Sequence, residues 1–257
     1  VSAFSVLRSL SKSSRAGQPF VGFGDPELRG SNAPVRAALL ERMTTQIDPT
    51  LLSAELAPLP ETRGELTALA RTLKARESDL YFGPRASEAL IKETDLSGYR
   101  IVAFATHGLL AGEFRGLAEP ALVLTPPPKA SSRDDGLLMA SEIATLRLNA
   151  DWVVLSACNT AAPADRAGAE GLSGLAKAFF YAGSRALLVS HWWVASDATV
   201  LLTTGAIQVL AENPGIGRAE ALRRAMLPLM DGKRQPEFAH PAFWGPFVNV
   251  GEGGRVQ

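Results

Sequence analysis

Short apolar runs that end at turn-forming residues recur along the chain, and this pattern predicts β-strands. The first run, residues 19–23, is closed by Gly24-Asp25-Pro26, which is a strong turn signal. Several runs are apolar at every position, as is typical of strands that are buried on both faces of a sheet. The predicted strands are residues 19–23, 80–82, the run from 101 that leads to His107, 121–125, 152–156 and 186–190.

Apolar residues at helical spacing predict helices between these strands. Pro84 is expected at the start of one helix, Ser141 at the cap of another, and Gly183 just beyond the end of a third. Strands that alternate with helices indicate an α/β sandwich with a mainly parallel sheet. The predicted helices are residues 62–75, the segment after Pro84, 141–146, 170–182, 197–210 and 218–230.

A single domain over residues 19–250 is expected, because 257 residues with 46% hydrophobic content are enough for one sizeable core. Residues 1–18 are predicted to be a hydrophilic approach from a missing upstream region, and residues 251–257 a flexible tail. Prolines interrupt the pattern from Glu27 to Pro60, which predicts an excursion over the surface. Proline, serine and charged residues at 126–135 predict a flexible or cleavable loop, in which Arg133 is a candidate self-cleavage site.

Charge and cysteine content narrow the classes of function. With 26 basic and 26 acidic residues, the net charge of zero argues against direct nucleic-acid binding or an anionic membrane partner. No apolar run approaches the roughly 18 to 20 residues that span a bilayer, and the first 20 residues lack a signal-peptide core, so a soluble protein is expected. A single cysteine excludes an internal disulfide and favours a reducing, cytoplasmic location.

The same counts predict that no metal or cofactor is needed. Three scattered histidines and one cysteine form no recognisable zinc pattern. The segment Gly22-Phe23-Gly24 resembles a phosphate-binding loop only superficially, because the GK[ST] ending is missing.

Two apolar strands stop at reactive side chains, IVAFATHG at His107 and WVVLSACNT at Cys158. Reactive groups in such sheets sit where strands end at their carboxyl edge. His107 lies 51 residues before Cys158, and this order and spacing match the caspase-type arrangement, whereas a papain-like enzyme places its cysteine first. An isolated cysteine after an apolar strand is also often an inert small hydrophobic residue, and spacing alone leaves that alternative open.

The chain resembles a CHAT domain, a member of the caspase-like clan of cysteine peptidases that also includes caspases, separases and gingipains. The resemblance runs almost end to end and implies a caspase-like three-layer αβα sandwich. Family members usually carry this domain behind helical TPR-type repeats. The matching blocks are VGFGDP at 21–26, Leu59-Pro60 with Glu65 beyond, FATHG at 104–108, PALVL at 120–124, DGLL at 135–138, LSACNT at 155–160, EGL at 170–172 and HPAFWGPFV at 240–248.

The resemblance implies a catalytic dyad of Cys158 as nucleophile and His107 as general base and acid, with no third orienting carboxylate. A thiol with a pKa of about 8.5 needs such a base to supply thiolate at neutral pH. The backbone amides of Gly108 and Cys158 are the expected oxyanion donors, since glycine lets the main chain approach a tetrahedral intermediate closely.

Resemblance to separases and other arginine-directed members makes Asp197, 39 residues after Cys158, the candidate floor of a pocket for arginine or lysine. An aspartate at a helix start is also an ordinary N-cap, worth about 1 kcal/mol. Trp192 and Trp193 are expected to wall neighbouring substrate pockets or stack on a cation, although packing onto the core is an alternative. The family more often has a proline beside this position.

Two functions follow from these residues. The first is a cysteine endopeptidase that cuts a protein substrate after a basic residue, such as a pore-forming or signalling protein in a bacterial signalling or defence system. TPR-type repeats or a sensor subunit would regulate it. The second is a catalytically silent CHAT module that serves as a protein-interaction scaffold.

Overall fold

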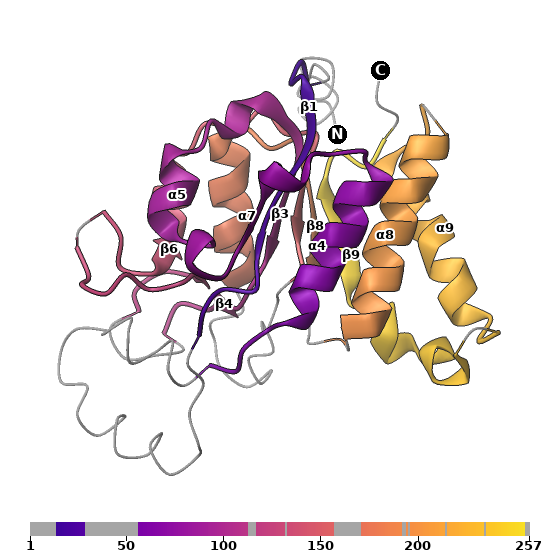
Figure 1. Ribbon diagram of the computed structural model, residues 1–257. Helices are drawn as coiled ribbons and strands as arrows, with labels where there is room; N and C mark the ends of the chain where they lie inside the picture. The colour runs from indigo at the N-terminus through magenta and orange to yellow at the C-terminus, as the bar shows by residue number, and fades with distance from the viewer. Residues whose placement is uncertain are drawn as a thin grey trace, which may run out of the picture.

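A computed structural model describes residues 14–28, 56–112, 117–131, 133–156, 171–191, 194, 196–213, 215–233 and 235–254. A six-stranded sheet forms the centre of the molecule, with helices on both faces (Figure 1). Five of its strands are parallel, and the sixth pairs antiparallel with its neighbour at one edge. In spatial order the strands are β2 (Leu80–Phe82), β1 (Gln18–Gly24), β3 (Tyr99–Ala105), β7 (Trp152–Leu155), β8 (Ala186–Ser190) and β9 (Phe247–Gly251).

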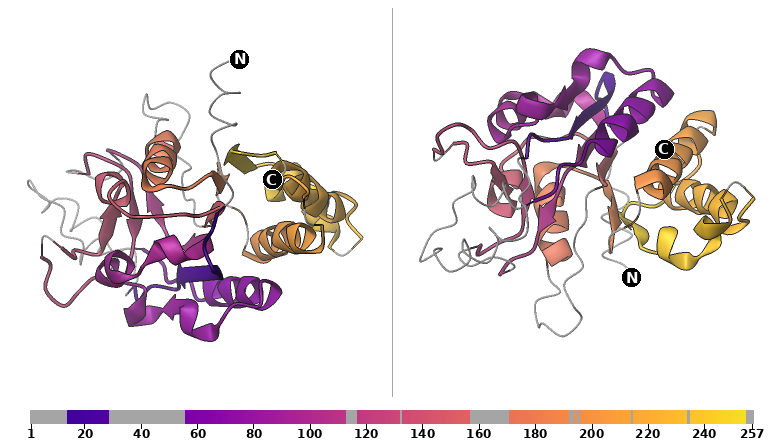
Figure 2. Two further views of the ribbon diagram at one scale, coloured as in Figure 1. Left: turned by 90° about the horizontal axis from the view of Figure 1, so that it is seen from above. Right: turned by 60° about the horizontal axis from the view of Figure 1, so that its bottom comes forward.

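The helices form the outer two layers, as the views from two directions show (Figure 2). One face is covered by α5 (Glu88–Glu93), α6 (Ala140–Ile143) and α7 (Gly171–Ala182), and the other by α4 (Glu61–Thr72), α8 (Ser196–Glu212) and α9 (Arg218–Met230). A small antiparallel sheet contains β4 (Gly108–Leu109), β5 (Ala121–Val123) and β6 (Leu137–Met139). The structure is thus the α/β sandwich with a mainly parallel sheet that the sequence predicts.

Apolar side chains fill the space on each side of the sheet. On one face the ring of Phe104 lies between Phe23 and Phe179, at centroid distances of 5.5 and 5.4 Å. On the other face Leu66 of α4 and Trp152 of β7 are buried in a second core. Strands covered on both faces require apolar residues at every position, which explains the continuous runs in the sequence.

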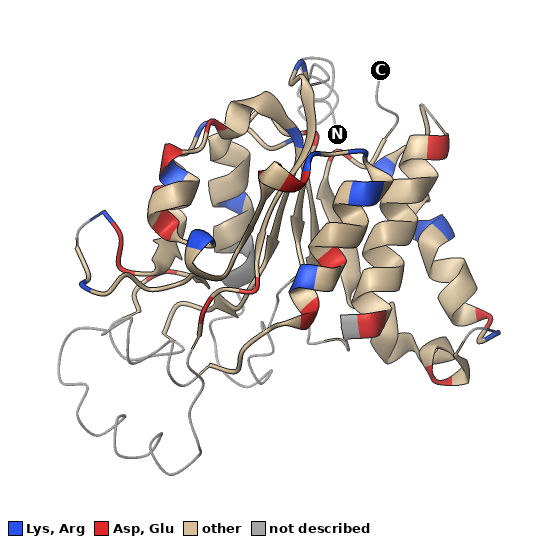
Figure 3. Cartoon of the chain, in the orientation of Figure 1, with Lys and Arg blue, Asp and Glu red and all other residues tan. Residues whose placement is uncertain are grey.

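The charged residues lie mainly on helices and loops, and basic and acidic positions alternate along the described parts of the chain (Figure 3). This distribution agrees with the net charge of zero. None of the helices in the described ranges combines the length and the apolar character that crossing a membrane requires.

Two predicted helix starts are wrong in detail. Pro84 lies in a single 3₁₀ turn, Gly83–Arg85, and α5 begins only after Ser87, whose hydroxyl accepts a hydrogen bond from the amide of Leu90 at 3.3 Å. Ser141 is not a cap, because α6 already begins at Ala140. Its amide and hydroxyl instead donate to the carboxylate of Glu119, each at 2.7 Å.

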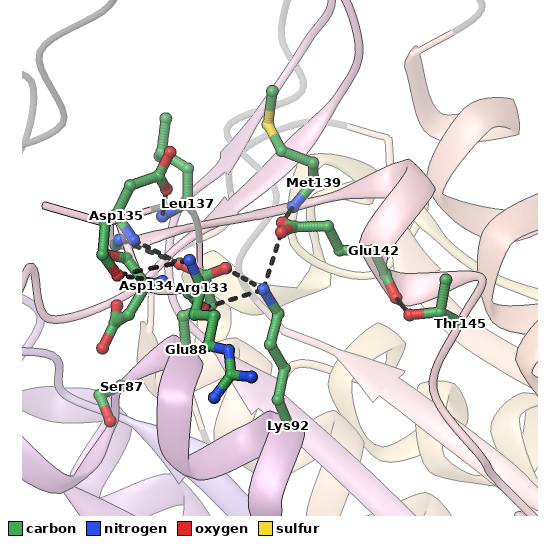
Figure 4. Close-up of polar contacts among 12 residues, drawn as sticks. Ser87, Glu88, Lys92, Arg133, Asp134, Asp135, Leu137, Met139, Glu142 and Thr145 are labelled. Carbon is green, nitrogen blue, oxygen red and sulfur yellow. Dashed lines mark hydrogen bonds and ion pairs between the residues drawn. The ribbon is translucent and has the colours of Figure 1, made fainter.

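The loop after β5, which the sequence predicts to be flexible, is anchored to α5 (Figure 4). Buried Glu88 accepts the amide N–H groups of Asp135 and Gly136 at 2.8 and 3.1 Å. Lys92 forms ion pairs with Glu88 and with Glu142 and donates to the carbonyl of Arg133 at 3.0 Å. Burial raises the pKa of Glu88 to about 7, although the Lys92 ammonium and the Asp135 amide favour its charged form. These contacts connect the main chain of residues 133–136 to α5, and self-cleavage at Arg133 stays a prediction.

Candidate active site

The carboxyl ends of the parallel strands bring the start of both reactive segments together. Phe104 of β3 pairs with Leu155 of β7, and the amide of Ser156 donates to the carbonyl of Phe104 at 3.1 Å. His107 follows Phe104 by three residues, and Cys158 follows Leu155 by three residues. The two segments thus leave neighbouring strands at matched positions. Cys158 itself lies outside the described residues.

The ring of half-buried His107 is oriented by a main-chain carbonyl. Its Nε2 lies 2.8 Å from the carbonyl oxygen of Ala57, in the segment that precedes α4. Because a carbonyl oxygen only accepts hydrogen bonds, Nε2 must carry the proton. In the neutral imidazole the basic lone pair is then on Nδ1, so Nδ1 is the atom that can take up a proton. An orienting group that sequence analysis did not nominate is therefore supplied by the backbone.

The backbone on either side of His107 is fixed by β5. The carbonyl of His107 accepts the amide of Val123 at 2.8 Å, and the hydroxyl of Thr106 donates to the carbonyl of Val123. Gly108 pairs with Leu122 in the next position of the antiparallel ladder. Hydrogen-bonded and non-hydrogen-bonded pairs alternate in such a ladder, so the amide of Gly108 points away from β5.

The structure places the predicted specificity residue at the same edge of the sheet. Asp197 is exposed in the first turn of α8, which follows β8. A carboxylate there is stabilised by the helix dipole. Since β7 lies between β3 and β8, the strands that lead to His107 and Asp197 are about 10 Å apart. Trp192 and Trp193 lie outside the described residues.

A buried carboxyl, Glu65 of α4, lies beneath this edge and is only 3% exposed. Its Oε1 is 3.2 Å from the hydroxyl of Thr203 on α8. Burial raises its pKa to about 7, with a smaller contribution from Glu61, whereas the hydroxyls of Ser156 and Thr203 lower it. In the sequence, Glu65 stands out only as part of a matching motif. The signal it offered is an acidic residue on the apolar face of a predicted helix.

A cavity of about 560 Å³ lies at the opposite, amino-terminal edge of the strands, where Ile101 and Trp152 line it. Its most prominent polar group, the carboxylate of Asp151, is matched by protein donors: the side chains of Arg100 and Arg218 at 3.1 and 3.5 Å and the amide of Ser14 at 3.0 Å. The cavity is therefore separate from the site at His107. Within the described ranges, no three His, Cys, Asp or Glu side chains gather as metal ligands would.

Comparison with known proteins identifies the family of the chain. Residues 1–252 match the family model described as CHAT domain. A segment of 115 residues is 32% identical to tetratricopeptide repeat protein 28 of Mus musculus. This segment is 45% of the present chain but only 4% of the mouse protein, so the chain spans a small part of that relative. The family match covers nearly the full length and agrees with the fold, and the chain therefore belongs to the CHAT domain family, within the caspase-like clan of cysteine peptidases.

Proposed function

We propose that the chain is a cysteine endopeptidase in which Cys158 attacks a peptide carbonyl and His107 transfers the protons. The contact between His107 Nε2 and the Ala57 carbonyl is the observation that carries this proposal. It supports a general-base role because it holds the ring and leaves Nδ1 as the basic atom. The matched positions of the two segments on paired strands support the same assignment.

The reaction would proceed by acyl transfer. Nδ1 of His107 takes the proton of the Cys158 thiol, and the thiolate adds to the peptide carbonyl to form a tetrahedral oxyanion. The amides of Gly108 and Cys158 would donate to that oxyanion, and the orientation of Gly108 away from β5 supports its part. Collapse breaks the C–N bond while His107 returns the proton to the leaving amine. Water, deprotonated by His107, then hydrolyses the thioester and releases the acid and the thiol.

We further propose cleavage after arginine or lysine, with Asp197 binding the basic side chain. Its exposure in the first turn of α8 leaves the carboxylate accessible to a substrate guanidinium, which pairs well with carboxylates. Trp192 and Trp193 would form apolar walls beside it. The family more often carries a proline near these residues, so the shape of the pocket is expected to be particular to this chain.

The physiological setting that we propose is a cytoplasmic bacterial signalling or defence system. The substrate would be a protein, such as a pore-forming or signalling protein, and TPR-type repeats or a sensor subunit would control the domain. The similarity to a mouse protein named for tetratricopeptide repeats supports the link to such repeats.

Fluorogenic peptides that differ only in the residue before the scissile bond test the proposal. Turnover of arginine or lysine peptides is expected, and Cys158→Ala or His107→Ala should reduce it by at least about 10³-fold. Asp197→Asn should weaken turnover of basic peptides selectively, whereas Glu212→Gln, at the other end of α8, should not. Full activity of Cys158→Ala would refute the nucleophile, and a preference for aspartate would refute the pocket. No turnover, with a thiol that ignores an electrophilic probe, would favour the silent scaffold.

A further inference from the structure

Glu65 is the buried titratable group that the proposed reaction does not use, and it joins three elements that lead to the proposed site. Its own helix, α4, follows the segment that contains Ala57. Thr203, its partner at 3.2 Å, is on α8, the helix that begins beside Asp197. Figure 1 shows α4 and α8 next to each other over the same face of the sheet. The third element is β7, because Ser156, the residue after this strand and two residues before Cys158, lies near Glu65.

The single hydroxyl proton of Thr203 decides how Glu65 can bond. The Thr203 oxygen lies 2.8 Å from the carbonyl of Thr199 and 3.2 Å from Glu65 Oε1. A carbonyl oxygen only accepts, so while Thr203 donates its proton to Thr199 it presents only a lone pair to Glu65. To donate to Glu65, and so to favour the ionised carboxyl, Thr203 must turn away from Thr199. Glu65 completes the second hydrogen bond only if it is itself the donor. A neutral carboxyl therefore fits this position better than a carboxylate.

The hydroxyl of Ser156 completes the junction. It is buried, makes no hydrogen bond of ordinary geometry within the described residues, and lies close enough to Glu65 to favour the ionised carboxyl. When Glu65 donates to Thr203, its carbonyl oxygen remains free to accept from Ser156. The neutral form thus satisfies both hydroxyls, whereas the ionised form faces the Thr203 lone pair unless Thr203 releases Thr199.

We propose that Glu65 is a positioning residue of the peptidase, which holds the carboxyl end of β7 and the first turns of α8 against α4 by donating to Thr203 and accepting from Ser156. Ionisation of Glu65 loosens this junction and lowers the rate. The inference rests on the proposed function, because the residues that Glu65 positions are those of the proposed site.

The groups around Glu65 determine the pH range in which its carboxyl ionises. On α4 itself, exposed Glu61 disfavours ionisation, while β7 and α8 present only the hydroxyls of Ser156 and Thr203 among the groups that act on it. With a pKa of about 7, the neutral fraction of Glu65 changes across neutral pH. The junction is therefore sensitive to pH near neutrality.

Two substitutions separate hydrogen bonding from packing. Glu65→Gln mimics the neutral acid, since its amide donates and its carbonyl accepts, but it does not ionise. Glu65→Met fills a similar volume without either bond, and Glu61→Gln, exposed on the same helix, serves as the control. The readouts are kcat and KM for a basic peptide from pH 5.5 to 9, and the alkylation rate of Cys158 by iodoacetamide. Cys158 is the only cysteine, so labelling reports on this thiol alone.

Glu65→Met should lower kcat by about tenfold or more with KM within about threefold, because misplaced groups cost rate rather than binding. Glu65→Gln should retain the wild-type kcat at pH 6. Its kcat divided by that of the wild type should rise as the pH passes 7, a comparison that cancels any pH dependence that the two proteins share. The ratio of the alkylation rates should rise in the same way.

A flat Gln-to-wild-type ratio at all pH values would overturn the inference, as would a fully active Glu65→Met protein. Either result with normal peptide turnover would leave the proposed peptidase intact. If the wild type turned over no peptide and His107→Ala left the alkylation rate unchanged, the proposed function would fail, and with it the role of Glu65. Should Glu65→Met not fold, the Gln-to-wild-type ratio alone decides.

Discussion

Replacing Glu65 by glutamine should stabilise the folded protein at alkaline pH. In the folded state burial raises the pKa of Glu65 from its ordinary value of 4.5 to about 7. The folded protein therefore binds more protons than the unfolded chain between these values. The free energy of unfolding must then fall as the pH rises through this range. The destabilisation is absent below pH 4.5 and fully present above pH 7. Glutamine cannot ionise, so the variant does not incur it.

The size of the effect follows from the pKa. A tenfold change in an acid dissociation constant corresponds to 1.36 kcal/mol, so the full difference is about 3 kcal/mol. Between pH 5 and pH 8 most of it, about 2 to 3 kcal/mol, should be lost by the wild type but not by Glu65→Gln. Buried Glu88 also has a raised pKa, but it is common to both proteins and cancels in their difference.

Urea unfolding of the wild type, Glu65→Gln and Glu61→Gln at pH 5 and pH 8 provides the measurement. Glu61 is exposed one turn earlier on α4, so its variant controls for the loss of a negative charge on that helix. The difference in unfolding free energy between Glu65→Gln and the wild type should increase with pH. If the two proteins lose the same stability between the two pH values, the pKa of Glu65 in the folded protein is not raised above its ordinary value, and the argument from its burial is refuted.

Three further predictions concern the scaffold of the site. Lys92→Met removes the cation between Glu88 and Glu142 and the donor to the Arg133 carbonyl, so limited trypsin digestion should cut faster after Arg133, and an unchanged rate would contradict the anchoring role. Gly183→Ala should cost at least about 2 kcal/mol in urea unfolding, because φ is +110° and a Cβ would lie 2.3 Å from the Leu148 carbonyl. Gly215→Ala, at φ +93° in open space, should cost only about 1 kcal/mol, and equal losses would refute the steric argument. Phe104→Ala should cost about 3 to 5 kcal/mol, because its ring is buried between Phe23 and Phe179, and a loss under 1 kcal/mol would show that the core repacks.

The central strands could be predicted because their burial on both faces determines which residues the sequence has there. A strand covered by helices on both faces, such as β3, must be apolar almost throughout, and such runs are easily recognised. The strands of the small sheet have a much weaker pattern in the sequence. The sequence analysis did not predict β4 or β6, which have two and three residues and are too short for any periodicity to be read.

The loop at residues 126–135 makes contacts that its own composition does not predict. Residues 126–135 are rich in proline, serine and charge, and this composition predicts flexibility. The groups that hold the loop are Glu88 and Lys92, on a helix that precedes it by about 40 residues in the chain. A tertiary partner at that separation cannot be inferred from the composition of the loop itself. The hydrogen bonds that Glu88 accepts from the loop oppose the conformational entropy that such a loop loses on becoming ordered.

In the candidate site, too, some residues can be predicted from their side-chain chemistry, whereas others are recognised only in the folded structure. His107 could be nominated because a histidine after an apolar strand is chemically distinctive. The Ala57 carbonyl could not, because every residue has a carbonyl and only the folded chain places this one 2.8 Å from Nε2. Glu65 is visible in the sequence as an acid on an apolar helix face, but its partners Ser156 and Thr203 come from two other elements. Helix α4 and the segment before it thus provide both of the contributions that sequence analysis missed. Substitutions there are consequently expected to affect the proposed peptidase reaction through the orientation of His107 and the position of β7, although α4 itself contains no proposed catalytic residue.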